Sequence, residues 1–491
     1  MNLRDLVTAV DGHADRARDL PDATVTGVVQ DHREVQPGSV FIARVGAKFD
    51  AHDWLPSVAE AGAVLAVGRG HDDPSGGRYG VPYLHTPDDR AAVAVWASAF
   101  YRQPADAVRV LGVTGTDGKT STASLLWWLL QGHSTTALGS TALSRIGVHP
   151  ATAFGGFTTP EATDVQAFLA GARDAGAERV VMESSSHGLT LRRLDEIAFK
   201  TSVWTNLTPE HLDFHGSMEA YAAAKRTLFE RSETAVLNAD AAWLETFAGA
   251  AQRDVLYGEH PLADWRILDV SEHAGGMHVT VGTPDGQTVP MDVPMVGRYN
   301  AWNAVGALAA AVVETHLPAE TLAARMAEFP GVPGRMQVVQ TEPFAVIVDF
   351  AHTPTALETM LQALPERRGE LRIVLGAAGA RDPSKRRPLG ETAARLADMT
   401  YFTEEDSRHE PTDAILEELT AGARDAGGVE GVSYVAIPDR REAIRAAVRE
   451  ARAGDVIVLC GKGHERTLER MNETLDWDEA AEAAAALAGD D

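Results

Sequence analysis

The stretch Gly112-Val-Thr-Gly-Thr-Asp-Gly-Lys-Thr-Ser121 decides the fold of the middle of the chain. Apolar residues 108–113 lead into it as a buried strand, and apolar residues 125–130 follow it as a helix. A strand, a glycine loop and a helix N-terminus together form a cradle of backbone N–H groups that suits phosphate. Within it, Lys119 is placed to reach the β- and γ-phosphates of a nucleoside triphosphate, and Thr120 to hold Mg²⁺ through its hydroxyl.

The loop departs from the strict phosphate-loop pattern at one position. That pattern requires a glycine five residues before Gly118, where this chain has Val113. Glycine recurs here at every third residue instead, at positions 112, 115 and 118. Because the strand before the loop and the helix after it are both present, we interpret the stretch as a nucleoside-triphosphate-binding loop.

Composition limits the classes of function. The length of 491 residues predicts about three domains. A net charge of −26 argues against a nucleic-acid partner, which needs clustered Lys and Arg. The single cysteine, Cys460, excludes an internal disulfide framework and suits a reducing compartment. Since no apolar run reaches membrane-spanning length and the N-terminus lacks a signal pattern, we expect a cytoplasmic monomer without membrane insertion.

Turn signals divide the chain into three expected α/β domains. Proline-containing stretches at residues 102–105 and 331–335 are the boundaries, which predicts domains over 1–105, 106–333 and 334–491. Strands alternating with helices predict a central phosphate-loop domain with a mostly parallel sheet and a Rossmann-like C-terminal domain. The expected strands are 24–30, 40–44, 63–67, 179–183, 201–205, 234–238, 345–349, 371–375 and 455–459, with an antiparallel patch over 264–296. The expected helices are 55–61, 90–100, 218–229, 300–314 and 440–452.

Three further places carry side chains that suit phosphate chemistry. Glu183 ends an expected strand, where a carboxylate can hold Mg²⁺ or simply face solvent. His211 and His215 stand four residues apart beside acids, which leaves zinc, Mg²⁺ or an ordinary surface loop open. Neither a His-Glu-x-x-His pattern nor a nearby cysteine supports zinc. Lys225 lies in an amphipathic helix, where a lone lysine is usually solvated, so residue chemistry alone does not single it out.

Together these and other stretches resemble the Mur ligases, the ATP-dependent amide-bond synthetases of peptidoglycan assembly. Within that family the sequence is similar to the UDP-N-acetylmuramoyl-tripeptide synthetase (MurE) type, over nearly the whole chain. One such match is weak evidence, but this many in the right order is specific. The similar stretches are residues 115–120, 158–161, 182–189, 206–216, 299–303, 333–336, 348–354 and 461–465.

The resemblance implies roles for the matched residues. Lys225 matches a lysine that CO₂ carbamylates, which turns a cation into an anionic Mg²⁺ ligand. The implied catalytic residues are Lys119, Glu183, His211 and Lys225, and the implied ligands of two Mg²⁺ ions are Thr120, Glu183, His211 and the Lys225 carbamate. The implied ATP contacts are Gly115, Thr116, Asp117, Gly118, Lys119, Thr120, Ser121, Asn300, Asn303, Arg335, Asp349 and Lys385. The implied contacts to the UDP-muramoyl dipeptide are Thr158, Thr159, Ser185 and Arg193, and those to the incoming amino acid are Arg381, Gly461 and Glu465.

The loop that selects the amino acid departs from the family pattern. Enzymes of the family that add meso-diaminopimelate usually have Asp-Asn-Pro-Arg, where this chain has Glu405-Asp406-Ser407-Arg408. Arg408 could bind a distal carboxylate through two hydrogen bonds, whereas Glu405 and Asp406 suit a distal ammonium, as in lysine or ornithine. The first domain also departs from the family at residues 31–33 and 50–52, which weakens the expected uracil contacts.

The resemblance implies a reaction. The D-Glu carboxylate of UDP-MurNAc-L-Ala-D-Glu would attack the γ-phosphate of ATP, and the amine of diaminopimelate, lysine or ornithine would then displace phosphate from the acyl phosphate. Two Mg²⁺ ions and Lys119 would offset the repulsion between the two anions. The product serves peptidoglycan synthesis, and through it cell shape and division.

Three alternatives remain at this point. A folylpolyglutamate synthase or another Mur-type ligase also joins an amino acid to a carboxylate, but the former lacks an expected counterpart to residues 1–105. The others are a nucleotide-dependent kinase or switch, and a binding protein without catalysis.

Overall fold

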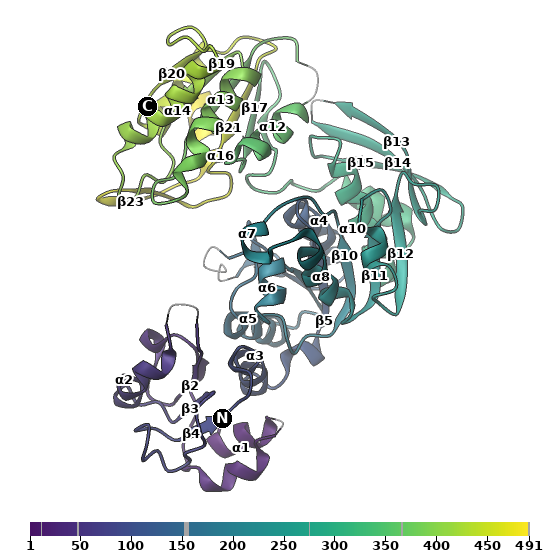
Figure 1. Ribbon diagram of the computed structural model, residues 1–491. Coiled ribbons are helices and arrows are strands. Elements are labelled where there is room, and N and C mark those ends of the chain that lie inside the picture. Colours follow the sequence, from purple (N-terminus) through teal and green to yellow (C-terminus); the bar gives the residue numbers. More distant parts are fainter. Residues whose placement is uncertain (11, 47–48, 152–156, 274, 365–366, 490–491) are drawn as a thin grey trace. The chain divides into compact units, whose positions relative to one another are not determined.

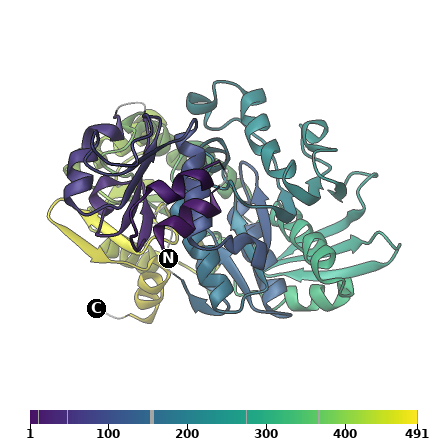
Figure 2. The same cartoon turned by 90° about the horizontal axis from the view of Figure 1, so that it is seen from below.

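The computed structural model describes residues 1–10, 12–46, 49–151, 157–273, 275–364 and 367–489 (Figures 1 and 2). The chain divides into two compact units, Met1–Asp264 with Gly306–Leu317, and Trp265–Val305 with Pro318–Asp491. The division falls within helix α10 (Asn300–Thr315). Both units are of the α/β class, which confirms the predicted fold class, while the three domain boundaries stay predictions. Every helix among the described residues is too short or too polar to span a bilayer.

The N-terminal part of the first unit is built on a parallel sheet of order β1-β2-β3-β4. Its strands are β1 (Gly27–Val29), β2 (Ser39–Ala43), β3 (Leu65–Gly68) and β4 (Tyr83–His85). The strand predicted over 24–30 is therefore too long, because only three of its residues pair with β2. The helices are α1 (Leu3–Ala9), α2 (Leu55–Glu60) and α3 (Asp89–Phe100), with short 3-10 turns at Ala14–Asp19, His32–Glu34, Ala51–Trp54 and Pro104–Ala107.

The rest of the first unit surrounds a second sheet of order β12-β11-β10-β5-β9-β6-β7-β8. The strands from β12 to β6 are parallel, and β7 and β8 are antiparallel additions. The strands are β5 (Arg109–Thr114), β6 (Thr136–Gly139), β7 (Ser144–Ile146), β8 (His149–Pro150), β9 (Arg179–Glu183), β10 (Phe199–Trp204), β11 (Ser232–Asn238) and β12 (Arg253–Gly258). The helices are α4 (Lys119–Gln131), α5 (Ala162–Asp174), α6 (Ser186–Thr190), α7 (Leu212–His215), α8 (Met218–Phe229) and α9 (Leu244–Phe247).

The position of β5 organises this sheet. It lies between β9 and β10, so that the carboxyl ends of three parallel strands meet where the glycine loop begins. Ligands of open parallel sheets bind at this edge. The sheet therefore places Glu183, at the end of β9, and the residues after Trp204 next to the loop.

The second unit begins with an antiparallel patch. Strands β13 (Trp265–His273), β14 (Gly276–Gly282) and β15 (Thr288–Val293) pair in sequence order, which confirms the patch predicted over 264–296. Helix α11 (Ala319–Met326) packs on β15.

The remainder of the second unit is a sheet of order β16-β17-β21-β18-β19-β20, parallel except for β16. Its strands are β16 (Gln337–Gln340), β17 (Ala345–Asp349), β18 (Leu371–Leu375), β19 (Met399–Phe402), β20 (Tyr434–Ala436) and β21 (Val456–Cys460), and a separate hairpin contains β22 (Thr467–Arg470) and β23 (Glu473–Asp476). The helices are α12 (Pro354–Gln362), α13 (Arg386–Leu396), α14 (Thr412–Asp425), α15 (Arg440–Glu450) and α16 (Glu479–Ala488), with a 3-10 turn at Pro383–Lys385.

Alternating side chains of these strands build two cores, one on each face of the sheet. In β17, Ile347 packs with residues of α12, α13 and α14, whereas Val346 and Val348 pack with residues of α15 and α16. This alternation follows from the two-residue period of a strand. The sheet is thus covered on both faces, as the continuous apolar sequences of its parallel strands predict.

A fully buried ion pair joins the first residues of α15 and α16. The side chains of Arg440 and Glu479 are both 0% exposed, and Nη2 of Arg440 lies 2.6 Å from Oε1 of Glu479. The arginine also donates to the carbonyl of Cys460 at 2.7 Å, and Trp477 donates its Nε1–H to Glu479 at 2.6 Å. These hydrogen bonds replace the water that both charges lose on burial.

We predict that Glu479→Ala strongly destabilises the second unit, because it leaves the Arg440 charge buried without its carboxylate. The expected loss in the free energy of unfolding is about 3 kcal/mol or more. Glu482→Ala is the matched control on the same helix, since its partner Arg441 is 44% exposed, and it should cost less than about 1 kcal/mol. Urea unfolding of both variants measures the difference, and equal small losses would contradict the prediction.

Candidate active site

The glycine loop is held from the end of the neighbouring strand β10. A Cβ on Gly115, whose φ is +156°, would lie 1.9 Å from Oγ1 of Thr205, so this close approach requires glycine. Thr205 donates its hydroxyl to the carbonyl of Asp117 at 2.5 Å. The amide N–H of Asp117 donates to Oδ1 of Asn206 at 3.0 Å, and that of Thr116 donates to the Asn206 carbonyl at 3.1 Å. Residue chemistry did not identify Thr205 and Asn206 as supports of the loop, although Asn206 lies in one of the matched stretches.

Two lysines converge on one carbonyl of the loop. Lys119 donates from Nζ to the carbonyls of Gly115 at 3.0 Å and Thr116 at 2.5 Å. Lys225, from helix α8, donates to the same Gly115 carbonyl at 2.7 Å and lies 4.6 Å from the centre of the Tyr221 ring. The residue is only 1% exposed, so the general expectation of a solvated lysine is wrong.

The environment of Lys225 favours its neutral amine. Burial, and then the charge of Lys119 nearby, hold the pKa of Lys225 well below its usual range. A neutral lysine amine is a nucleophile, whereas an ammonium is not. The structure therefore places a buried lysine, whose neutral form its surroundings favour, against the loop that is expected to bind phosphate.

Three histidines cluster near this lysine. The ring centre of His187 lies 4.6 Å from that of His211 and 5.6 Å from that of His215. His211 also lies 6.3 Å from the Tyr221 ring, on which Lys225 packs. Burial lowers the pKa of both His187 and His215, which favours neutral imidazoles. Among the described residues, no three His, Cys, Asp or Glu side chains are grouped so that they could hold a metal ion.

Glu183 is buried, and hydrogen bonds hold both its carboxylate and its backbone carbonyl. Its carboxylate accepts hydrogen bonds from the Ser140 hydroxyl at 2.6 Å and from the amide of Thr141 at 2.9 Å. Its backbone carbonyl accepts from Oγ1 of Thr159 at 3.0 Å. The residue is 1% exposed. The carboxylate is thus fixed at the end of β9, the position that the sequence predicts for it.

The residues expected to contact the muramoyl dipeptide gather around Thr159. Its hydroxyl accepts from the amide of Ser185 at 2.9 Å, and its carbonyl accepts from Nη1 of Arg193 at 2.9 Å. Thr158 precedes it in the chain. Arg193 also forms an ion pair with Glu161, whose carboxylate lies 3.4 Å from Arg44. The structure therefore brings Thr159, Ser185 and Arg193 together, with Glu183 adjoining them.

The second unit contains the other expected nucleotide residues. Asn303 donates to Oδ1 of Asn300 at 2.8 Å, and both are buried on α10. The Asp349 carboxylate accepts from the amides of Met336 and Ala351, each at 2.8 Å, and burial raises the pKa of Asp349. Arg335, which packs 4.7 Å from the centre of the Phe350 ring, places its positive charge near that carboxylate. Lys385 ends the 3-10 turn after β18.

The loop after β19 holds Arg408 in a network of contacts. Its Nε donates to Glu469 at 2.8 Å, its Nη1 to the carbonyl of Gly379 at 2.9 Å, and its Nη2 lies 3.3 Å from Asp406. The sequence indicated that Arg408 could bind a distal carboxylate of the substrate. In the structure it is already bound by two carboxylates of the protein.

A second cation, Lys462, organises the neighbouring acids. It is 0% exposed, and its Nζ lies 2.7 Å from Asp406 and 2.6 Å from Glu465. Sequence reasoning missed Lys462, although it stands between two glycines of a matched stretch. The same stretch contains Gly461, where a Cβ would lie 2.7 Å from Oε2 of Glu405.

Two residues expected to contact the amino acid differ in their surroundings. Glu405 is 6% exposed, and its Oε2 has no hydrogen-bond partner among the described residues. Burial raises the pKa of Glu405. Arg381, in contrast, is exposed to solvent after β18.

Comparisons with known proteins identify the family of the chain. Residues 113–311 match the family described as Mur ligase middle domain, and residues 334–463 match the Mur ligase, glutamate ligase domain. The UDP-N-acetylmuramyl-tripeptide synthetase of Deinococcus radiodurans is 45% identical over 505 residues, covering 99% of this chain and 100% of that protein. The UDP-N-acetylmuramoyl-L-alanyl-D-glutamate–2,6-diaminopimelate ligase of Gloeobacter violaceus is 39% identical over 476 residues, covering 96% and 95%.

The solved structures give the same result. A structure of a UDP-N-acetylmuramoyl-L-alanyl-D-glutamate–2,6-diaminopimelate ligase superposes with a TM-score of 0.68 at 28% identity, and the match covers 95% of both chains. The matches include both family domains and extend along nearly the full length of the relatives. The chain therefore belongs to the Mur ligase family of enzymes.

Proposed function

We propose that this chain is an ATP-dependent ligase that adds a diamino acid to the D-Glu carboxylate of UDP-MurNAc-L-Ala-D-Glu. The relatives at 45% and 39% identity are named for this step or for tripeptide synthesis. One observation carries the proposal, namely the convergence of Lys119 and the buried Lys225 on the carbonyl of Gly115. A kinase or switch needs the first lysine only. The second one supplies a neutral amine at the place where a carbamate would face the phosphates.

The residues around the loop suit Mg²⁺ once that carbamate is formed. Addition of CO₂ to the neutral Nζ of Lys225 releases a proton and leaves a carbamate with two anionic oxygen acceptors. Oxygen is the ligand that Mg²⁺ prefers, and Thr120 and Glu183 provide further oxygens, with His211 as a nitrogen donor. Because the described side chains do not form a metal site by themselves, phosphate oxygens of ATP would complete the coordination. When bound, Mg²⁺ would neutralise charge between the substrate carboxylate and the γ-phosphate.

The reaction then proceeds in two displacements. A carboxylate oxygen of D-Glu attacks the γ-phosphorus, and the bond from that phosphorus to the bridging oxygen of ADP breaks. Lys119 exchanges its loop carbonyls for the phosphate oxygens and stabilises their charge. The neutral amine of the diamino acid then attacks the acyl carbon, phosphate leaves, and the amine loses a proton. The products are ADP, phosphate and an amide.

The charges around the loop after β19 favour a diamino acid with a distal ammonium. Four carboxylates lie there, on Glu405, Asp406, Glu465 and Glu469; Arg408 and Lys462 pair with the last three, and the charges of Arg440, Lys385 and Lys462 act on Glu405. Oε2 of Glu405 has no hydrogen-bond partner among the described residues, so an ammonium can donate to it, whereas a second substrate carboxylate cannot. We therefore propose lysine or ornithine as the added amino acid, in preference to meso-diaminopimelate.

The direct test is to incubate the protein with UDP-MurNAc-L-Ala-D-Glu, ATP and Mg²⁺ and to offer diaminopimelate, lysine and ornithine at equal concentration. Mass spectrometry of the nucleotide product should show the lysine or ornithine tripeptide in excess, with one ADP per amide. Preference for diaminopimelate would contradict the charge argument. Absence of any tripeptide would contradict the proposed function.

Arg408→Ala separates two roles of that arginine. If its contacts with Asp406 and Glu469 define its role, the variant should lose activity with all three amino acids by a similar factor. Steady-state kinetics with each amino acid measures this factor. A loss of activity with diaminopimelate alone would instead show that Arg408 binds the distal carboxylate of that substrate.

Lys225→Ala tests the carbamate. The variant should lose activity by about a hundredfold or more, because an anionic group in the phosphate site is lost. Acetate or formate should restore part of it, since a small carboxylate can occupy the place of the carbamate. Lys119→Ala is the matched control, and carboxylates should not restore its activity because Lys119 acts as a cation. Equal responses of both variants would contradict the assignment.

A further inference from the structure

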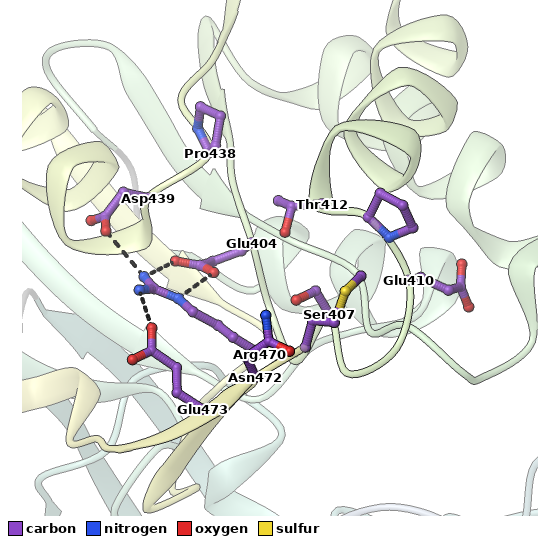
Figure 3. Close-up of a pocket in the computed structure, with 11 residues that line it drawn as sticks. Glu404, Ser407, Glu410, Thr412, Pro438, Asp439, Arg470, Asn472 and Glu473 are labelled. Atoms are coloured by element: carbon purple, nitrogen blue, oxygen red, sulfur yellow. Dashed lines mark hydrogen bonds and ion pairs between the residues drawn. The ribbon is translucent and has the colours of Figure 1, made fainter.

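A pocket of about 480 Å³ lies in the second unit beside the loop that follows β19 (Figure 3). Residues of that loop, from Glu404 to Thr412, line one side of the pocket. Residues 470–473 of the β22–β23 hairpin line a second side, and Pro438 and Asp439, which precede α15, line a third. Three segments that are distant in sequence thus meet around this space.

One arginine connects all three segments. Arg470 donates from Nε to Glu404 at 2.9 Å and from Nη2 to Asp439 at 3.0 Å, and its Nη1 donates to Glu473 at 3.1 Å (Figure 3). A second contact to Glu404, from Nη2, measures 2.5 Å, so the guanidinium binds that carboxylate through two nitrogens. The side chain of Glu404 is only 4% exposed, and that of Arg470 is 28% exposed. A bidentate pair of this kind fixes orientation as well as distance.

Glu469, the residue before Arg470 in β22, binds the middle of the loop. The amide of Glu469 donates to Asp406 at 3.0 Å, and its carbonyl accepts from the amide of Arg408 at 3.1 Å. Its carboxylate binds Nε of Arg408 at 2.8 Å. Strand β22 therefore contacts the loop at its first residue through Arg470 and at its middle through Glu469.

The backbone of this loop needs such support. Residues 404–408 are in no helix or strand, and Arg408 has φ of +52°, in the left-handed region. That conformation is unfavourable for a residue with a side chain and persists only where surrounding contacts hold it. The hairpin thus helps to hold the loop, together with Arg440, whose amide donates to Oε1 of Glu404 at 3.2 Å and whose Nη1 donates to the Glu404 carbonyl at 3.1 Å.

We propose that Arg470 is a positioning residue for the incoming amino acid. It fixes Glu404 against β22 and so sets the backbone of residues 405–408. The inference rests on the proposed function, in which that loop meets the diamino acid. All the contacts described for Arg470 are to the loop, the hairpin and the residue before α15, and it acts on the substrate through Glu404.

The test is to measure the KM of each of the three substrates separately. Arg470→Ala should raise the KM of the amino acid by about ten- to a hundredfold, because a misplaced loop loses its alignment with the substrate. The KM values of ATP and UDP-MurNAc-L-Ala-D-Glu should stay within about twofold, since no contact of Arg470 leads to the phosphate loop. Arg470→Lys should recover part of the loss, because it keeps the charge without the planar fork.

A matched control separates positioning from general stability. Arg445 has the same exposed fraction, 28%, and pairs with Glu442 within α15. Arg445→Ala should leave all three KM values unchanged. If Arg470→Ala instead changes the three KM values equally, or lowers only the melting temperature, its role is structural and the proposal is wrong.

A double-mutant cycle tests the route through Glu404. If Arg470 acts through that carboxylate, Glu404→Gln should raise the KM of the amino acid similarly, and the double variant should be no worse than the worse single variant. If the two substitutions raise the KM of the amino acid by factors that multiply in the double variant, Arg470 does not act through Glu404. The unsubstituted protein distinguishes the two proposals. If it makes no tripeptide, the proposed function itself is wrong. If it is active and Arg470→Ala leaves the KM of the amino acid unchanged, only the positioning role is wrong.

Discussion

The close approach of Gly115 to Thr205 is the constraint on which the first unit depends. Since a Cβ at position 115 would lie 1.9 Å from the Thr205 hydroxyl, the loop can follow β5 only with glycine there. This contact brings the end of β10 against the loop and leaves the Gly115 carbonyl facing Lys119 and Lys225. One backbone oxygen thus accepts hydrogen bonds from two lysine side chains of different helices. In the proposed reaction, Lys119 exchanges this carbonyl for phosphate oxygens, whereas Lys225 acts as a carbamate.

In the second unit, the charged side chains around the loop after β19 are mostly paired with one another. Around the loop after β19 nearly every charged group is bound by another, as Arg408 is by Glu469 and Lys462 by Asp406. Buried ion pairs of this kind contribute little net stability, but they fix geometry. Glu405 is the exception, since one of its oxygens has no hydrogen-bond partner in the part of the chain that the structure describes. A site arranged in this way suits a small cationic group more than an anionic one.

Much of the architecture could be predicted from the sequence, because buried parallel strands are continuous apolar runs. The strands predicted at 179–183, 345–349 and 371–375 have the bounds found in the structure, and the helix at 218–229 does too. The environment of Lys225 could not be predicted from residue chemistry. The pattern of α8 shows an amphipathic helix, but which of its positions meets the glycine loop depends on the order of the strands.

Long-range pairing explains the other omissions. Hydrogen bonds join Lys462, Arg470 and Asn206 to residues that lie 56, 66 and 89 positions away in the chain. A local sequence pattern cannot predict contacts over such separations. The resemblance to a family pointed to the matched stretches, and the comparisons confirm the family. The roles of the individual site residues stay predictions, supported by the way the structure groups Lys119 with Lys225 and Thr159 with Ser185.

An isotope measurement distinguishes whether ATP activates the substrate carboxylate as an acyl phosphate, as we propose. The side-chain carboxylate of D-Glu in UDP-MurNAc-L-Ala-D-Glu is labelled with ¹⁸O, and the released phosphate is analysed by mass spectrometry. We expect one ¹⁸O atom in each phosphate, because the oxygen that attacks the γ-phosphorus leaves with it when the amine displaces phosphate. Unlabelled phosphate accompanying amide formation would show that no acyl phosphate forms.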